Sequence, residues 1–214
     1  MPTAIGRGVR VEIALTFGTP KTVTAVTLAS PGVATSSAHA MANGTVGYFT
    51  ATGGGMPQID GQAARVYNQA TNTFEIQGLN TSGYSAWNTG TFTPAATWGT
   101  LAEAVGYNIG GGGGDSLDDT KLMDVAKQEL NGLLASDTVT LDLKSQTYNN
   151  SVMQLIEDAS IAQTYLMFRI TLQDGAVRVF RGQPSRPGES LQVGQLATGQ
   201  ISIKVKGFAL RGQA

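Results

Sequence analysis

Cysteine is absent from this chain of 214 residues, and histidine occurs once, as His39. Without cysteine there is no disulfide scaffold, no thiolate nucleophile and no thiolate-ligated metal. A metal site needs several ligands at suitable distances, and a second imidazole is not available. We therefore interpret His39 as a structural residue of a turn and predict no metal site.

Long apolar segments are also missing. No run of about 18 apolar residues occurs, so the sequence predicts no membrane-spanning helix. The N-terminal segment MPTAIGRGVRVEIAL lacks the apolar centre of a secretory signal. We expect a protein that is made in a cytoplasm, leaves it only by lysis, and does not insert into a membrane.

Charged residues are scarce, at 14% of the chain against about 25% in typical soluble domains. Glycine is abundant, with 28 residues, and serine and threonine are plentiful. This composition suits an all-β protein with many turns, and also a chain that buries much of its surface against copies of itself. An ordinary secreted β-domain is the alternative interpretation of the same composition.

The few charges are unevenly distributed. Residues 1–100 carry a net charge of +1, residues 101–160 carry −7, and residues 161–214 carry +5. Such charges can neutralise each other within one fold, or meet across a head-to-tail contact between copies, where they set register. Neither arrangement favours nucleic-acid binding by a basic face. For the second arrangement, the candidate basic partners are Arg169, Arg178, Arg181, Lys204 and Lys206.

Alternation of apolar and polar residues predicts a first strand over residues 7–17, with Val11 on one side and Glu12 on the other. Residues 20–90 hold few charges and several turn dipeptides, including Asn-Gly and Asp-Gly, whose backbones tolerate positive φ. We predict a small barrel there, with short strands at 22–28, 32–37, 45–51, 63–69 and 73–78.

Five consecutive glycines, residues 110–114, precede the acidic sequence DSLDDT. A phosphate-binding loop would instead lead directly into a helix, with Lys-Ser or Lys-Thr after it, and carboxylates would repel a phosphate. We interpret the run as a mobile loop that a neighbouring molecule fixes, because free glycines have the largest backbone entropy.

Three acidic residues in the next segment, Asp118, Asp119 and Asp124, invite comparison with a general acid and base pair. No histidine, cysteine or conspicuous serine accompanies them, and such residues far more often occupy turns or solvated faces. We predict no catalytic residue, no cofactor and no enzymatic activity.

The C-terminal half contains the one convincing helix pattern, over residues 151–162, which Ser151 and Gln154 would begin as a capping box. Its apolar stripe predicts a helix that covers a sheet. Around it, the pattern predicts strands at 91–109, 121–126, 138–143 and 201–205, and a hairpin over 164–183 that turns at Asp174-Gly175.

Three segments of this half follow a specific order. Asp118-Asp119-Thr120 comes first, then residues 127–133 with the pattern Lys-x-x-Leu-x-Gly-Leu, then residues 137–143. With the helix, hairpin, loop and final strand behind it, this order resembles the tail tube proteins of phages with long non-contractile tails. The resemblance covers residues 1–19 and 91–214. It implies a mainly β core, a β-sandwich or barrel with one flanking α-helix, into which the small β-barrel domain of residues 20–90 is inserted.

The predicted insert has a resemblance of its own. Its VTAVT strand, the turn around His39, the GMPQIDG loop, the NTFEIQGL strand and the GYSAW ending are similar to the first catalytic-cysteine half domain of ubiquitin-activating enzymes. The similarity implies a fold and not ubiquitin chemistry, because the module has no catalytic role there and this chain has no cysteine.

The tail tube resemblance implies rings of six copies, joined by side-by-side continuation of their sheets and stacked head-to-tail into a hollow tube. Such a tube conducts double-stranded DNA without binding it specifically, so we expect a lumen of net negative charge. The implied protein partners are the tape measure, tail tip and tail terminator proteins. The expected contact between rings is the glycine loop and its acidic continuation: Gly110, Gly112, Gly114, Asp115, Asp118 and Asp119.

Two other interpretations remain open at this point. One is a β-rich module that binds a host surface or glycan, with Tyr84, Trp87 and Trp98 as stacking groups. The other keeps the fold but makes the protein a tail terminator, a joining ring or a bacterial secretion tube. Self-assembly separates the first from a tube protein, and the length of the assembly separates a joining ring from a tube.

Overall fold

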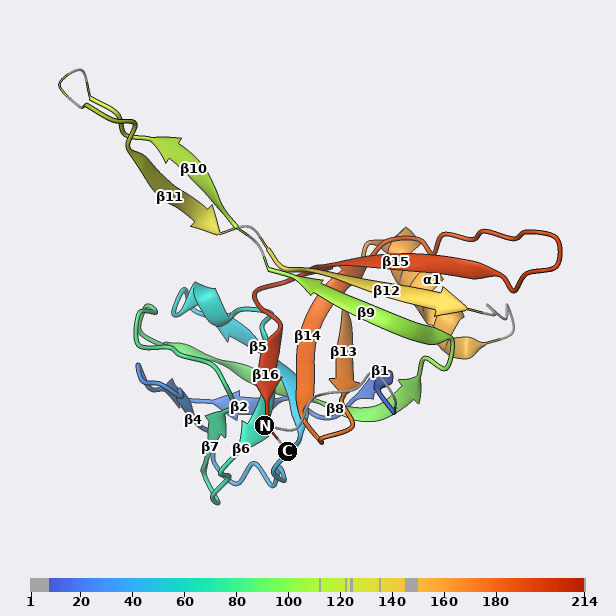
Figure 1. Ribbon diagram of the computed structural model, residues 1–214. Helices are drawn as coiled ribbons and strands as arrows, with labels where there is room; N and C mark the ends of the chain where they lie inside the picture. The colour runs from blue at the N-terminus through green and yellow to red at the C-terminus, as the bar shows by residue number, and fades with distance from the viewer. Residues whose placement is uncertain are drawn as a thin grey trace.

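The computed structural model describes residues 8–111, 113–121, 123, 125–134, 136–144 and 150–213; for residue 115 and residues 129–134 it describes the backbone alone. The described chain is mainly β with one α-helix (Figure 1), which confirms the predicted fold class. The N-terminal elements are β1 Arg10–Phe17, β2 Lys21–Val23, β3 Ala25–Val26, β4 Val33–Thr35, β5 Val46–Thr52, a 3-10 turn Pro57–Ile59, β6 Ala63–Tyr67, β7 Thr73–Ile76 and β8 Thr89–Thr100. The C-terminal elements are β9 Ala104–Gly110, β10 Gly114–Asp118, β11 Glu129–Leu134, β12 Thr138–Lys144, α1 Ser151–Ala162, β13 Leu166–Thr171, β14 Val177–Pro184, β15 Thr198–Val205 and β16 Leu210–Gly212.

Fourteen of these strands form one antiparallel sheet that curls on itself. Its main path runs β3-β4-β7-β6-β5-β8-β1-β13-β14-β15-β12-β9, while β2 adds to β8 and β16 adds to β14. β9 stands at one end of this path, so one edge of this seven-residue strand has no partner among the described strands.

The long strand β8 joins the two halves of the sheet. Its first residues pair with β2 and β5, where Phe92 lies opposite Phe49, and its last residues pair with β1. The boundary predicted between residues 20–90 and the rest of the chain therefore falls inside one strand. The division into two domains stays a prediction, but the sheet itself is continuous across it.

Two groups of buried side chains fill the fold. In the first, Phe49, Phe74 and Phe92 pack with ring centres 5.0, 5.3 and 6.3 Å apart. Met167 of β13 and Val179 of β14 belong to the same group, so it draws on both sides of the predicted boundary. Burying each such side chain contributes about 1.5–3 kcal/mol.

The second group lies under the helix. Ile156 of α1 is buried in it with Phe168 and Phe180, whose rings stack with centres 5.1 Å apart. Leu141 of β12 and Ile203 of β15 complete its centre. The helix therefore covers this part of the sheet with its apolar stripe, as its sequence predicts.

The bounds of α1, residues 151–162, are confirmed, but the predicted capping box is wrong. The N-cap is Asn150, whose Oδ1 accepts a hydrogen bond of 3.0 Å from the Val152 N–H. Asparagine is a preferred N-cap because its side-chain oxygen satisfies a backbone N–H that has no partner within the helix.

Two strand predictions are also corrected. The described residues of the segment 121–126 form no strand; they lie in the turn between β10 and β11. Alternation there misleads because no second layer of structure covers one face of the segment. Glu12, expected on a polar face of β1, is buried, because both faces of the middle of β1 are covered.

The C-terminal segment is tied to the strands of the 20–90 region. The buried amide of Gln62 donates a hydrogen bond of 2.8 Å to the Phe208 carbonyl, and the Phe208 N–H donates one of 2.9 Å back to Gln62 Oε1. Gly207, with φ of 79°, makes this approach possible, because a Cβ there would lie 1.9 Å from the same oxygen.

Candidate assembly surfaces

One hairpin projects from the body of the molecule (Figure 1). At the last pair of the β9–β12 ladder Gly110 lies opposite Thr138, and beyond this pair the chain leaves the body. Among the described strands, β10 and β11 pair only with each other, as a separate two-stranded sheet. We call β10, β11 and the turn between them, residues 114–134, the arm.

Glycines connect the arm to the body. A Cβ added at Gly111 or Gly113 would meet nothing within 4 Å, so packing does not require glycine at these positions. Their consequence is backbone freedom in the connection. Gly114 begins β10, Gly112 lies outside the described residues, and Asp115 is described by its backbone alone.

Hydrogen bonds hold the outer end of the paired strands. The Thr120 N–H donates to Asp118 Oδ1 at 2.9 Å, the Asp119 N–H to the Gln128 carbonyl at 3.0 Å, and the Gln128 N–H to Thr120 Oγ1 at 3.0 Å. Hydrogen bonding from Thr120, first its side chain and then its backbone, lowers the pKa of the exposed Asp118 carboxyl, because it stabilises the charged form. Asp118 is thus the last residue of β10, where its carboxylate holds the start of the turn, and Asp124 lies outside the described residues.

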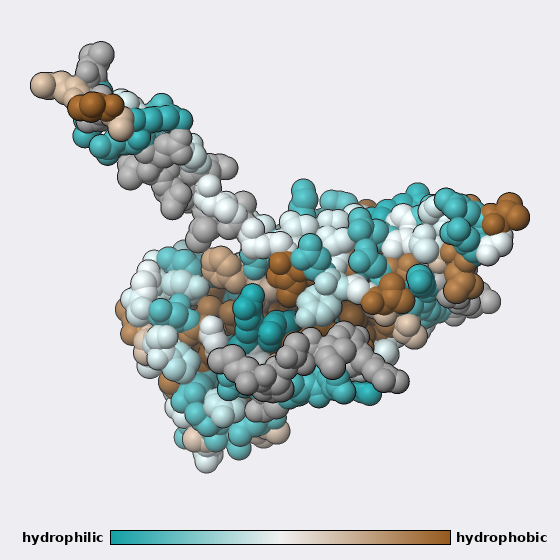
Figure 2. All heavy atoms as spheres, viewed as in Figure 1, coloured by the Kyte–Doolittle hydropathy of each residue, from teal (hydrophilic) through white to brown (hydrophobic). Residues whose placement is uncertain are grey.

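The tip of the arm carries apolar side chains that the rest of the described chain does not cover. Met123 is 94% exposed and Val125 is fully exposed, and Leu117 of β10 is also exposed. Figure 2 shows apolar atoms at this far end, next to hydrophilic ones. Exposed apolar groups in such a position mark an interaction site more often than a free surface.

A hollow of about 510 Å³ lies at the opposite end of the β9–β12 ladder. There the ladder shifts register between Leu143 and Asp142, a bulge that leaves Val105 of β9 60% exposed. The hollow is lined by Val105, Asp142, Leu143, Lys144, Gly188, Glu189, Ser190, Thr198, Gly199 and Gln200.

The loop between β14 and β15, residues 185–197, borders this hollow. Its apolar side chains Leu191, Val193 and Leu196 are exposed. In Figure 1 the loop lies at the end of the molecule away from the arm, and in Figure 2 apolar atoms are visible at the same end. The molecule therefore presents uncovered apolar groups at both ends of one ladder.

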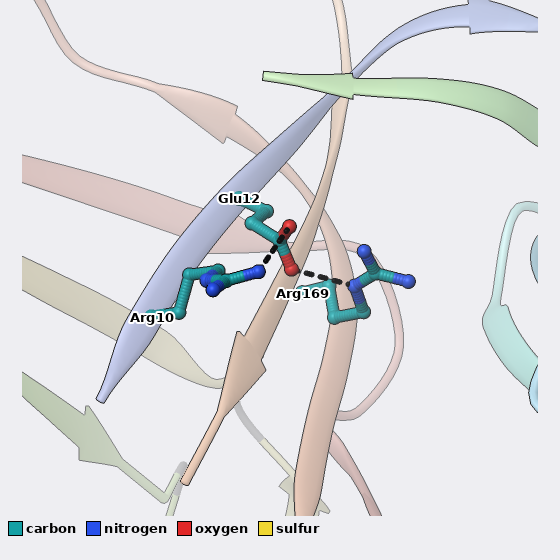
Figure 3. A network of polar contacts seen from close by, with 3 residues as sticks. All are labelled: Arg10, Glu12 and Arg169. Atoms are coloured by element: carbon teal, nitrogen blue, oxygen red, sulfur yellow. Dashed lines mark hydrogen bonds and ion pairs between the residues drawn. The ribbon is translucent and has the colours of Figure 1, made fainter. Parts of the chain in front are cut away.

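The predicted basic partners stand in a different part of the fold. Arg169 of β13 donates from Nε to the buried Glu12 carboxylate at 2.9 Å, and Arg10 approaches the same carboxylate at 3.9 Å (Figure 3). The Arg169 guanidinium also lies 4.2 Å from the centre of the Trp98 ring. Arg169 therefore has both an ion-pair partner and an aromatic partner within the chain.

Two further basic residues also have partners inside the chain. Arg181 lies over the rings of Tyr48 and Tyr165, at 4.1 and 5.2 Å. Lys206 contacts Asp60 at 3.3 Å. Of the remaining two, Arg178 is half-buried and donates to the carbonyl of Val177, and Lys204 is exposed on β15. Their assignment as charge partners between copies stays a prediction.

The aromatic residues considered for glycan binding pack against the first core group. Trp87 donates from its indole nitrogen to the Val23 carbonyl at 3.1 Å. Tyr84 and Trp98 are partly buried against the same group, and burial raises the pKa of Tyr84. These three side chains therefore contribute to the packing of the body, which leaves only part of each ring accessible.

His39 is a structural turn residue, as predicted. It is buried, its Nδ1 accepts a hydrogen bond of 3.0 Å from the Met41 N–H, and its ring meets Phe74 edge-on. Within the described ranges, no group of three or more His, Cys, Asp or Glu side chains could hold a metal ion. No helix in that part of the chain is long and apolar enough to span a membrane.

Comparison with known families shows to which family this architecture belongs. The family model for the phage tail tube protein matches residues 54–208. The chain belongs to this family. It is a structural protein of the phage tail, and its place is in the virion. None of the curated proteins matches the chain.

The matched residues contain the arm, the hollow, α1 and the loop between β14 and β15. The match begins at residue 54 and thus includes part of the region predicted as an insert. The tail tube resemblance is confirmed at the level of the family. The long non-contractile type of tail and the likeness of residues 20–90 to ubiquitin-activating enzymes stay predictions.

The predicted contact residues extend from Gly110 and Gly114 at the base of the arm to Asp118 and Asp119 at the outer end of its paired strands, and their role between rings stays a prediction. Met123 and Val125 were assigned to a strand because they alternate with their neighbours, although the flanking Lys121 and Lys127 indicate a solvated segment. Val105 was missed because its exposure depends on a bulge, which only the pairing of β9 with β12 reveals.

Proposed function

We propose that six copies of this chain form a ring, and that rings stack head-to-tail into the hollow tube of a long non-contractile tail. The tube conducts double-stranded DNA during ejection. The chain is made in the cytoplasm of a bacterial host, and the tube contacts tape measure, tail tip and tail terminator proteins. Membership of the tail tube family supports this proposal most broadly.

The observation that carries the proposal is the arm. A two-stranded hairpin alone in water is marginally stable at best, and the arm has no other sheet to pack on among the described residues. Its tip exposes Met123 and Val125 instead of burying them. Such an element is explained if a neighbouring copy covers it.

The edges of the body sheet support ring formation. Open edges are sites for pairing with another chain, and a closed ring satisfies them. β9 offers a seven-residue free edge, whereas β3, at the other end of the path, has two residues. Lateral pairing between copies therefore has its longest available edge at β9.

DNA passage sets a condition on the lumen. Arginine or lysine side chains free to contact phosphates would hold the DNA, so the lumen-facing residues should carry net negative charge. Arg169 and Arg181 are each engaged by aromatic rings and, for Arg169, by Glu12. This arrangement favours a lumen that the Arg169, Arg178 and Arg181 surface does not line.

Deletion of residues 111–114 tests the proposal. The deletion pulls the arm toward the body and removes its freedom to reach a neighbour, so we expect a folded, soluble monomer that forms no tubes in negative-stain electron microscopy. The matched control is the double substitution Gly111→Ser and Gly113→Ser, which keeps the length and places side chains in open space. Normal tubes from the deletion variant would contradict the proposed role of the arm, and an unmodified chain that stops at single rings would indicate a joining protein.

A further inference from the structure

The two uncovered apolar surfaces of this chain lie at opposite ends of one strand ladder. Gly110 pairs with Thr138 at the end from which the arm departs, and Ala104 pairs with Leu143 at the end that borders the hollow. At about 3.4 Å per residue, the ladder itself separates the two ends by roughly 20 Å, and the arm extends beyond it. One chain cannot bring its own tip to its own hollow while this ladder is intact.

We propose that the arm tip of one copy, with Met123 and Val125, docks into the hollow beside the exposed Val105 of the next copy along the tube. This inference rests on the proposed tube function and names the receptor of the arm.

The tip supplies a suitable knob. Met123 and Val125 are almost entirely exposed, and they stand at the end of a hairpin whose outer turn is held by Asp118, Thr120 and Gln128. Methionine adapts its flexible side chain to irregular apolar surroundings. Two such side chains on one turn form a compact apolar projection.

The hollow supplies a suitable receptor. It is a shallow, open depression of about 510 Å³, wide enough to receive the turn of a hairpin, with polar side chains such as Asp142, Lys144 and Glu189 around the apolar Val105. The bulge in the β9–β12 pairing leaves Val105 exposed at the wall of the hollow. The adjoining loop adds the exposed apolar side chains of Leu191 and Val193 beside the hollow.

A second copy of this chain is the occupant that the arrangement favours. Knob and hollow belong to the same chain, face opposite directions along one ladder and are different surfaces, so the contact between copies is heterologous. A heterologous contact repeats without closing when each copy is displaced along the same direction, and it then builds a filament. This geometry requires no other partner at either surface within the tube.

The absence of cysteine allows a direct test by disulfide cross-linking. Val105→Cys and Val125→Cys are placed together in one chain, and tubes of this variant are assembled under reducing conditions, verified by electron microscopy and then oxidised. We expect a ladder of covalent multimers on a non-reducing gel that collapses to monomer on reduction. Each single variant should give at least about tenfold less multimer, because the partner thiol is missing.

The matched control pairs Val125→Cys with Leu28→Cys, because Leu28 is 50% exposed, similar to Val105, but lies on the 20–90 region. Tubes of this control should give no ladder. If the Val105/Val125 variant forms intact tubes but no covalent multimers, the receptor assignment is wrong while the proposed tube function stands. The same conclusion follows if only the Leu28 control gives covalent multimers. If even the unmodified chain forms no tubes when supplied with tail-tip complexes, the proposed function fails and this inference fails with it.

Discussion

The body and the arm of this protein are stabilised in opposite ways. The body buries Phe49, Phe74 and Phe92 in one group and places the second group under α1. The arm is a lone two-stranded ladder whose tip residues Met123 and Val125 are exposed. The body is therefore packed within a single chain, whereas the arm has no such packing among the described residues and, under the proposed function, gains it from a neighbouring copy.

The largest effect on the body should come from its aromatic core. Phe92→Ala removes a side chain that is fully buried and packs on both Phe49 and Phe74, so we expect a loss of about 3–5 kcal/mol in the free energy of unfolding. Denaturant titration of the unassembled chain measures it. Phe17→Ala is the control, since that ring is 41% exposed, and it should cost less than half as much. Equal losses at both positions would mean that the first core group does not hold the body together.

A smaller effect is expected at the ion pair between β1 and β13. Glu12→Ala leaves Arg169 without its carboxylate, and we expect a loss of about 1.5–3 kcal/mol, because a charged hydrogen bond is removed from a largely buried site. Arg10→Ala removes the exposed partner at 3.9 Å and should cost about 0–1 kcal/mol. A loss from Arg10→Ala as large as that from Glu12→Ala would assign the stabilising contact to the wrong arginine.

The smallest effect should come from the arm. Asp118→Ala removes the acceptor of the Thr120 N–H, so exchange of that amide with solvent should accelerate while the melting temperature of the body stays unchanged. Asp118→Asn, which keeps an acceptor oxygen, is the control. A lowered melting temperature in Asp118→Ala would show that the arm and the body unfold together, which would contradict the claim that they are stabilised independently.

The same site predicts a dependence on pH. The pKa of Asp118 is lowered in the folded arm by hydrogen bonding from Thr120, so its contribution is present above the unfolded pKa. It is lost as the pH falls through the lowered folded value. Protection of the Thr120 amide should therefore be constant near neutral pH and decrease in acid, and the Asp118→Asn variant should show no such decrease.

The body was more predictable from the sequence than the arm, for physical reasons. The helix at residues 151–162 and the hairpin at Asp174-Gly175 are encoded by local spacing and turn chemistry, and both are confirmed. The burial of Glu12 depends on which strands flank β1, and the exposure of Val105 depends on a bulge in a pairing between distant strands. The sequence predicts a loop at residues 110–114 and a strand at 121–126 where the structure has the hairpin of β10 and β11, because glycine gives no alternation pattern and the pairing of the two strands is not a local property.

Hydrogen exchange of residues 114–134, compared between the unassembled chain and assembled tubes, tests the central claim most directly. We expect the arm amides of the unassembled chain to exchange much faster than the amides of β13 and β14, with only local protection at the hydrogen bonds around Thr120, and to become markedly slower in tubes. Arm amides that exchange as slowly as those of β13 and β14 in the monomer, or that exchange no slower in tubes, would contradict the claim that a neighbouring copy completes the arm.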